Sequence, residues 1–181
     1  FMAPGYTYLL AGCLWVFGGW GYAVLQVLQA VSGGIAAALV YAIAVRVFGV
    51  RVGLIAACLF AVHPVHVYVS SLHHPTSSIT LCVLGILWLL VRFCEERSAT
   101  RAAALGLCCG VSALIEPAVV CLAPVIALAP FVAARQDWVR ILQNGSVAAI
   151  CAVAVVAPWT IRNQVVFDRF VPVKSPLGYL L

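Results

Sequence analysis

Long uncharged apolar blocks alternate along the chain with short segments that carry arginine. Residues 22–45 contain no charged side chain and end at Arg46, which predicts one membrane helix followed by a basic turn. The next uncharged block, residues 52–91, would overshoot a bilayer at about 1.5 Å per residue, because about 20 residues cross the hydrocarbon. It must therefore turn back, and the only polar place to do so is SSLHHPTSS at residues 70–78.

The second half of the chain poses the same problem of length. Residues 102–134 are too long for one comfortable crossing and are broken by Glu116 and Pro117, which predicts a hairpin of two short helices. A single, steeply tilted helix is the alternative. The last apolar block is predicted to end at Pro158 and Trp159, before a polar tail with strand-like patches. The predicted spans lie near residues 22–45, 52–70, 77–92, 102–115, 117–134 and 141–157.

Residues 6–20 form a shorter apolar stretch that is edged with aromatic side chains and rich in glycine toward its end. These features favour a helix that lies in the membrane interface over one that crosses. The predicted fold class is an all-α, polytopic transmembrane helix bundle, with residues 1–181 as a single region of about six spans plus this interfacial helix. Residues 158–181 are expected to begin a segment on the outer face.

Composition supports the membrane class and excludes others. Hydrophobic residues make up 65%, charged residues 8%, and the mean hydropathy is +1.14, unlike a soluble domain in which about a quarter of the residues are charged. The net charge of +5 does not indicate a nucleic-acid partner, because the basic residues are scattered. The eight cysteines have no CxxC pair and are predicted to be small buried hydrophobes. The opening FMAPGYTYLL lacks the features of a signal peptide. Because the first residue is Phe, the chain is expected to begin partway through a larger protein.

The basic residues predict the orientation in the membrane. Three connectors hold seven of the ten Lys and Arg residues: Arg46, Arg51, Arg92, Arg97, Arg101, Arg135 and Arg140. The positive-inside tendency places the connectors 46–51, 92–101 and 135–140 in the cytoplasm, so the histidine-rich turn, Glu116 and the tail face outward. The triplet that begins at Asn144 is a glycosylation signal, but this topology places it near the cytoplasm and predicts that it is not used.

Ionisable groups at the outer face are the candidates for chemistry, because such groups are costly near a membrane. His63 and His66 lie three apart and, with His73 or His74, have a spacing that suits a metal, but hydrogen bonding to water, backbone or headgroups is favoured. No metal is therefore predicted. Glu116 either caps a turn among the headgroups or lines a polar cavity. The tail adds Arg162, Asp168, Arg169 and Lys174, and Arg162 either snorkels to lipid phosphate or grips the phosphate of a substrate.

Four stretches carry a resemblance to a known family. They are APGYTYLLA, the run from VLQAVSGG to SSITL, GLCCGVSALIEPAVVCLAP, and PWTIRNQVVFDRFVPVKSPLGY. Together they resemble C-type (GT-C fold) membrane glycosyltransferases, in the branch of dolichyl-phosphate-mannose protein mannosyltransferases and aminoarabinose transferases. The most specific pieces are the basic VFG turn at residues 46–51 and the tail at 158–173.

The resemblance implies transfer of a sugar from a polyprenyl-phosphate carrier to an acceptor lipid, glycan or protein on the outer face of the membrane. It implies that the catalytic acidic residue, the general base, lies upstream of Phe1, so the fragment itself is expected to be inactive. Arg162 and then Lys174 are the candidates for the donor phosphate, and His73 and His74 are expected to line the cavity near the sugar. Glu116 departs from the basic residue that many relatives have at this hairpin tip.

The partners implied are the sugar donor, membrane lipids and the acceptor, with no cofactor and no nucleic acid; the expected location is a bacterial inner membrane. Two other classes stay open at this point. In one, a transporter or channel subunit, the polar turn and Glu116 line a solute path and the histidines carry protons. In the other, the chain is a structural membrane subunit without catalysis.

Overall fold

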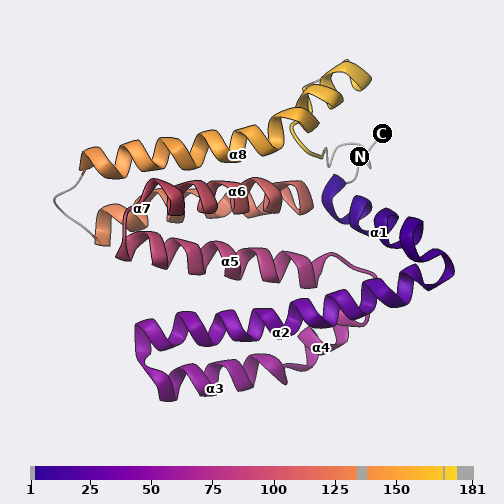
Figure 1. The fold of residues 1–181 in the computed structure, drawn as a ribbon, viewed down its shortest axis with the longest axis horizontal. Coiled ribbons are helices and arrows are strands. Elements are labelled where there is room, and N and C mark those ends of the chain that lie inside the picture. The colour runs from indigo at the N-terminus through magenta and orange to yellow at the C-terminus, as the bar shows by residue number, and fades with distance from the viewer. Residues whose placement is uncertain (1–2, 134–137, 169, 175–181) are drawn as a thin grey trace. The chain divides into compact units, whose positions relative to one another are not determined.

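The computed structural model describes residues 3–133, 138–168 and 170–174, and these are almost entirely helical (Figure 1). No strand occurs among them, so the predicted all-α class is confirmed. The 3-10 turns are labelled η. The elements are α1 (Pro4–Phe17), η1 (Gly18–Trp20), α2 (Gly21–Phe48), α3 (Val50–Ala61), α4 (Pro64–Ser70), α5 (Thr76–Glu95), α6 (Ala99–Ile115), η2 (Pro117–Leu122), α7 (Ala123–Ala133) and α8 (Trp138–Phe167).

Three helical stretches in the described part are long and apolar enough to cross a membrane: Pro4–Phe48, Thr76–Glu95 and Trp138–Phe167. A fourth is present if α3 and α4, which are bent by 51° to one another, form one broken span. Two shorter apolar helices cover Ala99–Ile115 and Pro117–Val132. The count of about six spans, and the interfacial position of residues 6–20, stay predictions.

The chain divides into two compact units. One consists of residues 6–88, and the other of residues 89 onward together with the first few residues. In the first unit α2 and α3 lie side by side as an antiparallel pair (Figure 1), because Gly49 turns the chain with a φ of +90°, a conformation that side chains with a Cβ rarely adopt. In the second unit α6 lies along α8 (Figure 1).

Helix ends follow local chemistry. Pro64 and Pro117 each stand at the first position of a helix, where the missing N–H costs nothing. The predicted end at Pro158 is wrong, because α8 continues through this proline to Phe167. A proline removes one N–H from an apolar helix, and the surrounding backbone bonds keep the helix intact. The expected strand-like patches in residues 158–167 are accordingly helical.

Candidate functional site

A short segment that follows α8 folds back along the end of that helix. We call residues 170–174 the strap. Three side chains of α8 donate hydrogen bonds to three consecutive carbonyl oxygens of the strap. The bonds run from Trp159 Nε1 to Val173 O (3.2 Å), from Thr160 Oγ1 to Pro172 O (2.9 Å) and from Asn163 Nδ2 to Val171 O (3.0 Å). Because the helix and the strap run in opposite directions, each donor meets the next carbonyl in turn.

Asn163 is the most buried of the three anchors, at 2% exposed. Its Nδ2 donates to the strap, and its Oδ1 accepts a hydrogen bond of 3.3 Å from Nη1 of Arg162. A buried amide that lost these partners would pay the full cost of desolvation. Asn163 therefore couples the position of the strap to that of the Arg162 guanidinium.

Replacing Asn163 with alanine is expected to destabilise the protein by about 1–2 kcal/mol, because the partly buried Val171 O then loses its donor. The measurement is the melting temperature of the purified protein in detergent. Gln164→Ala is the matched control, since Gln164 is the next residue of α8 and its side chain is exposed. A melting temperature that is equal in the two variants would contradict the role of Asn163 as an anchor.

The strap ends at Lys174, whose ammonium binds both oxygens of Glu116. The Nζ atom lies 2.7 Å from Oε1 and 2.9 Å from Oε2 of that carboxylate. Glu116 ends α6 and precedes η2, and its Oε1 also accepts from the backbone N–H of Ala118 at 3.5 Å. Both side chains are partly exposed, 36% for Lys174 and 23% for Glu116. The sequence allows Glu116 to be either a cap of a turn or a cavity residue. In the structure its carboxylate caps η2 and also binds Lys174.

Arg162 differs from Lys174 in having no acidic partner in the part of the chain that the structure describes. Its guanidinium carbon lies 4.8 Å from the ring centre of Trp159 and 5.5 Å from that of Phe167. These two rings attract the planar group by cation–π interaction without neutralising its charge. An arginine held in this way is available to bind an anion.

The histidine turn, residues 71–75, belongs to the other unit and is fastened to α2. Three residues on one face of α2, at positions 22, 26 and 29, make the contacts. The Tyr22 ring meets the His73 ring edge-on at 5.2 Å, Gln26 Nε2 donates to Ser71 O (3.0 Å), and Gln29 Nε2 donates to His74 O (2.7 Å). The side chains of His73 and His74 themselves are exposed, so the turn is fixed while both imidazoles stay accessible.

Four histidine side chains do not assemble a metal site. His74 Nδ1 lies 2.6 Å from Thr76 Oγ1, and the His66 ring packs on Phe60 at 4.5 Å. Together with His63, His66 lines an open, mostly apolar groove of about 400 Å³ beside α4. Within the described ranges no three His, Cys, Asp or Glu side chains are grouped closely enough to hold a metal ion. The absence of a metal stays a prediction.

A family model described as dolichyl-phosphate-mannose-protein mannosyltransferase matches residues 2–161. The chain belongs to this family. No curated protein and no solved structure matches it. Membership indicates an integral membrane glycosyltransferase that takes a sugar from a lipid-linked donor and passes it to an acceptor. It does not favour a transporter, a channel subunit or a non-catalytic membrane protein.

For this mannosyltransferase family member, the matched region contains His73, His74 and Glu116 and ends directly before Arg162. Of the predicted site residues, the structure brings Glu116 and Lys174 into contact and links Arg162 to the strap through Asn163. Arg135, Arg169 and residues 175–181 lie outside the described residues.

The residue pattern did not identify the side chains that fasten the strap and the histidine turn to their helices. Asn163 and Gln29 are polar side chains within apolar helices, and both are almost fully buried, at 2% and 1% exposed. Uncharged amides in such helices usually bind another part of the protein, since lipid offers them no partner. That was the available signal, although it does not name the partner.

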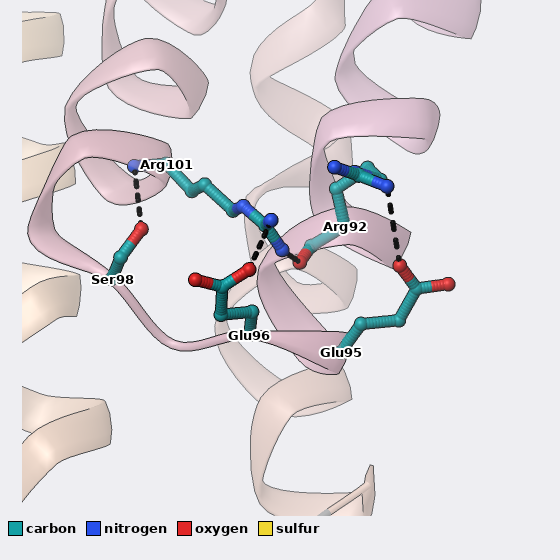
Figure 2. Close-up of polar contacts among 5 residues, drawn as sticks. All are labelled: Arg92, Glu95, Glu96, Ser98 and Arg101. Carbon is teal, nitrogen blue, oxygen red and sulfur yellow. Dashed lines mark hydrogen bonds and ion pairs between the residues drawn. The ribbon is translucent and has the colours of Figure 1, made fainter.

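The connector between α5 and α6 is rigidified by its own charges (Figure 2). Arg101 donates to the carbonyl oxygen of Arg92 (2.7 Å) and pairs with Glu96, while Ser98 caps α6 by accepting from the Arg101 N–H (3.3 Å). Asn144 of α8 donates to Arg97 O (3.0 Å) and is buried. A glycan on the Asn144 nitrogen would break this bond, which is a second reason to expect that the triplet is not used.

Proposed function

We propose that this protein transfers a sugar from a polyprenyl-phosphate carrier to an acceptor at the outer face of a bacterial inner membrane, and that Arg162 and Lys174 bind the carrier phosphate. The observation that carries the proposal is the anchored strap. One set of hydrogen bonds fixes Lys174 through the strap, and one member of that set, Asn163, also contacts Arg162. Two cations are therefore positioned by the same few residues.

The chemistry of the transfer suits such a pair. In the reaction the acceptor oxygen bonds to the anomeric carbon, the bond from that carbon to the phosphate oxygen breaks, and the carrier phosphate leaves with the electron pair. The acceptor proton passes to a carboxylate base of the kind that the family resemblance implies. A phosphate is a stable leaving anion, so the protein supplies cations to it instead of a general acid. Arginine contributes a planar fork and lysine a point charge.

The outer face follows from the basic connectors. Arg92 at the end of α5, Arg97 between the helices and Arg101 at the start of α6 lie close together in the sequence, and the positive-inside tendency assigns this junction to the cytoplasm. Parity of the predicted spans then assigns the histidine turn and the strap to the opposite side. The placement of His73 and His74 near the sugar stays a prediction.

Replacing Arg162 with alanine in the complete protein is expected to lower kcat/KM for the polyprenyl-phosphate sugar roughly tenfold to a hundredfold, the range for a lost hydrogen bond to a charged group. Arg162→Lys should recover part of the loss, since the charge returns without the fork. The assay follows transfer at varied donor concentration. Arg140→Ala, at the other end of α8, is the control and should transfer normally. Normal turnover by Arg162→Ala would remove this residue from the site.

A further inference from the structure

The ion pair between Lys174 and Glu116 places a carboxylate on one of the two cations assigned to phosphate. Both carboxylate oxygens lie within 2.9 Å of the ammonium, so the pair takes up the face of Lys174 that an anion would approach. A phosphate and Glu116 cannot both have the closest contact with one ammonium, because two anions at that distance repel each other. Arg162, in contrast, has no acidic partner in the described residues.

We propose that Glu116 competes with the carrier phosphate for Lys174, so that binding and release of the carrier exchange one anion for another on this ammonium. This inference rests on the proposed function and assigns a role to the one candidate residue that departs from the family pattern. Glu116 is thus a residue that sets affinity and release, and it takes no part in bond making.

The geometry allows such an exchange. The two side chains are 36% and 23% exposed, so the pair is not sealed from an incoming anion. Glu116 also keeps its contact with the Ala118 N–H, which remains available to the carboxylate when Lys174 turns to another partner. The strap holds the backbone next to Lys174, so only the flexible lysine side chain has to move.

The exchange acts more strongly on the product than on the donor. The donor is a phosphodiester with one negative charge, whereas the released carrier is a phosphomonoester with about −1.5 to −2 at pH 7. The more highly charged product binds a free ammonium more tightly. When Glu116 pairs with Lys174 again, it weakens the binding of the carrier phosphate and speeds the release of this product.

The test is the inhibition of transfer by a short-chain prenyl phosphate in the complete protein. Glu116→Gln keeps the size of the side chain and an oxygen for the Ala118 amide but removes the charge. We expect the inhibition constant to fall about fivefold, and the donor KM to fall by less, as for the loss of a partly exposed ion pair of about 1 kcal/mol. Glu116→Asp, with its shorter reach, should shift both in the same direction by a smaller factor.

Matched variants separate the possible outcomes. Glu96→Gln also removes a carboxylate that pairs with a cation, in this case Arg101. Glu96 lies between α5 and α6, so this variant should leave inhibition unchanged. Lys174→Met should weaken inhibition and cancel the effect of Glu116→Gln in the double variant. If Lys174→Met weakens inhibition while Glu116→Gln does not strengthen it, the competition is refuted and the phosphate site stands. If neither Lys174→Met nor Arg162→Ala alters inhibition, the phosphate site itself is refuted.

Discussion

Gly106→Leu is expected to separate α6 from α8 and to prevent the protein from accumulating in a folded form. A Cβ atom on Gly106 would overlap the carbonyl oxygen of Ala148 and would lie 2.8 Å from its carbonyl carbon. These are backbone atoms of α8, so no side chain can move aside. One turn later a Cβ on Gly110 would lie 2.9 Å from Ala152 O. Small residues four apart on both helices thus allow the two backbones to touch.

The expected cost is at least about 3 kcal/mol, the upper part of the range for overpacking, because relief requires moving a whole helix. The measurement is the fraction of protein that elutes as a single species in detergent, together with its melting temperature. Gly145→Leu is the matched control: it lies on α8, and a Cβ there meets no atom within 4 Å. Wild-type elution and melting of Gly106→Leu would show that α6 and α8 are not in close contact.

Most of the fold could be predicted from hydropathy, because helices are the simplest way to satisfy backbone groups in lipid. Positions of charge and of proline located the turns at residues 71–75 and at Glu116. Proline alone was a poor guide at residue 158, where the helix continues. The predicted helix over residues 52–70 is divided into α3 and α4, which are bent by 51° to one another. Pro64 indicates a loosened helix at this point, but a proline alone does not give the size of the bend.

The candidate site was less accessible to sequence reasoning. Charge identified Arg162, Lys174 and Glu116 as unusual in an apolar chain, but their pairing depends on where the strap docks. Docking is set by Asn163 and its neighbours through carbonyl oxygens, which every residue possesses. The residue types of the strap therefore do not predict that it binds to α8. The spacing of Gly106 and Gly110 was visible in the sequence, but its use depends on the alanines of α8.

A cysteine at position 73 is expected to react with a membrane-impermeant maleimide in intact cells, and a cysteine at position 95 only after the membrane is permeabilised. Helix α5, Thr76–Glu95, separates the two positions and is long and apolar enough to cross the bilayer by itself. The arginines of the following connector favour the cytoplasm for its far end. Each accessible site should label almost completely and each protected site hardly at all.

The experiment needs a background in which the eight native cysteines are alanine, since Cys58 and Cys121 are exposed. His73→Cys and Glu95→Cys are suitable probes because both side chains are exposed in the fold and neither caps a helix. Labelling of both sites from the same side would mean that α5 does not cross. The reverse pattern would place the arginine-rich connector outside, and the strap with Lys174 would then face the cytoplasm. A carrier phosphate at the outer face would have no cations to meet in that case, and the proposed direction of transfer would be wrong.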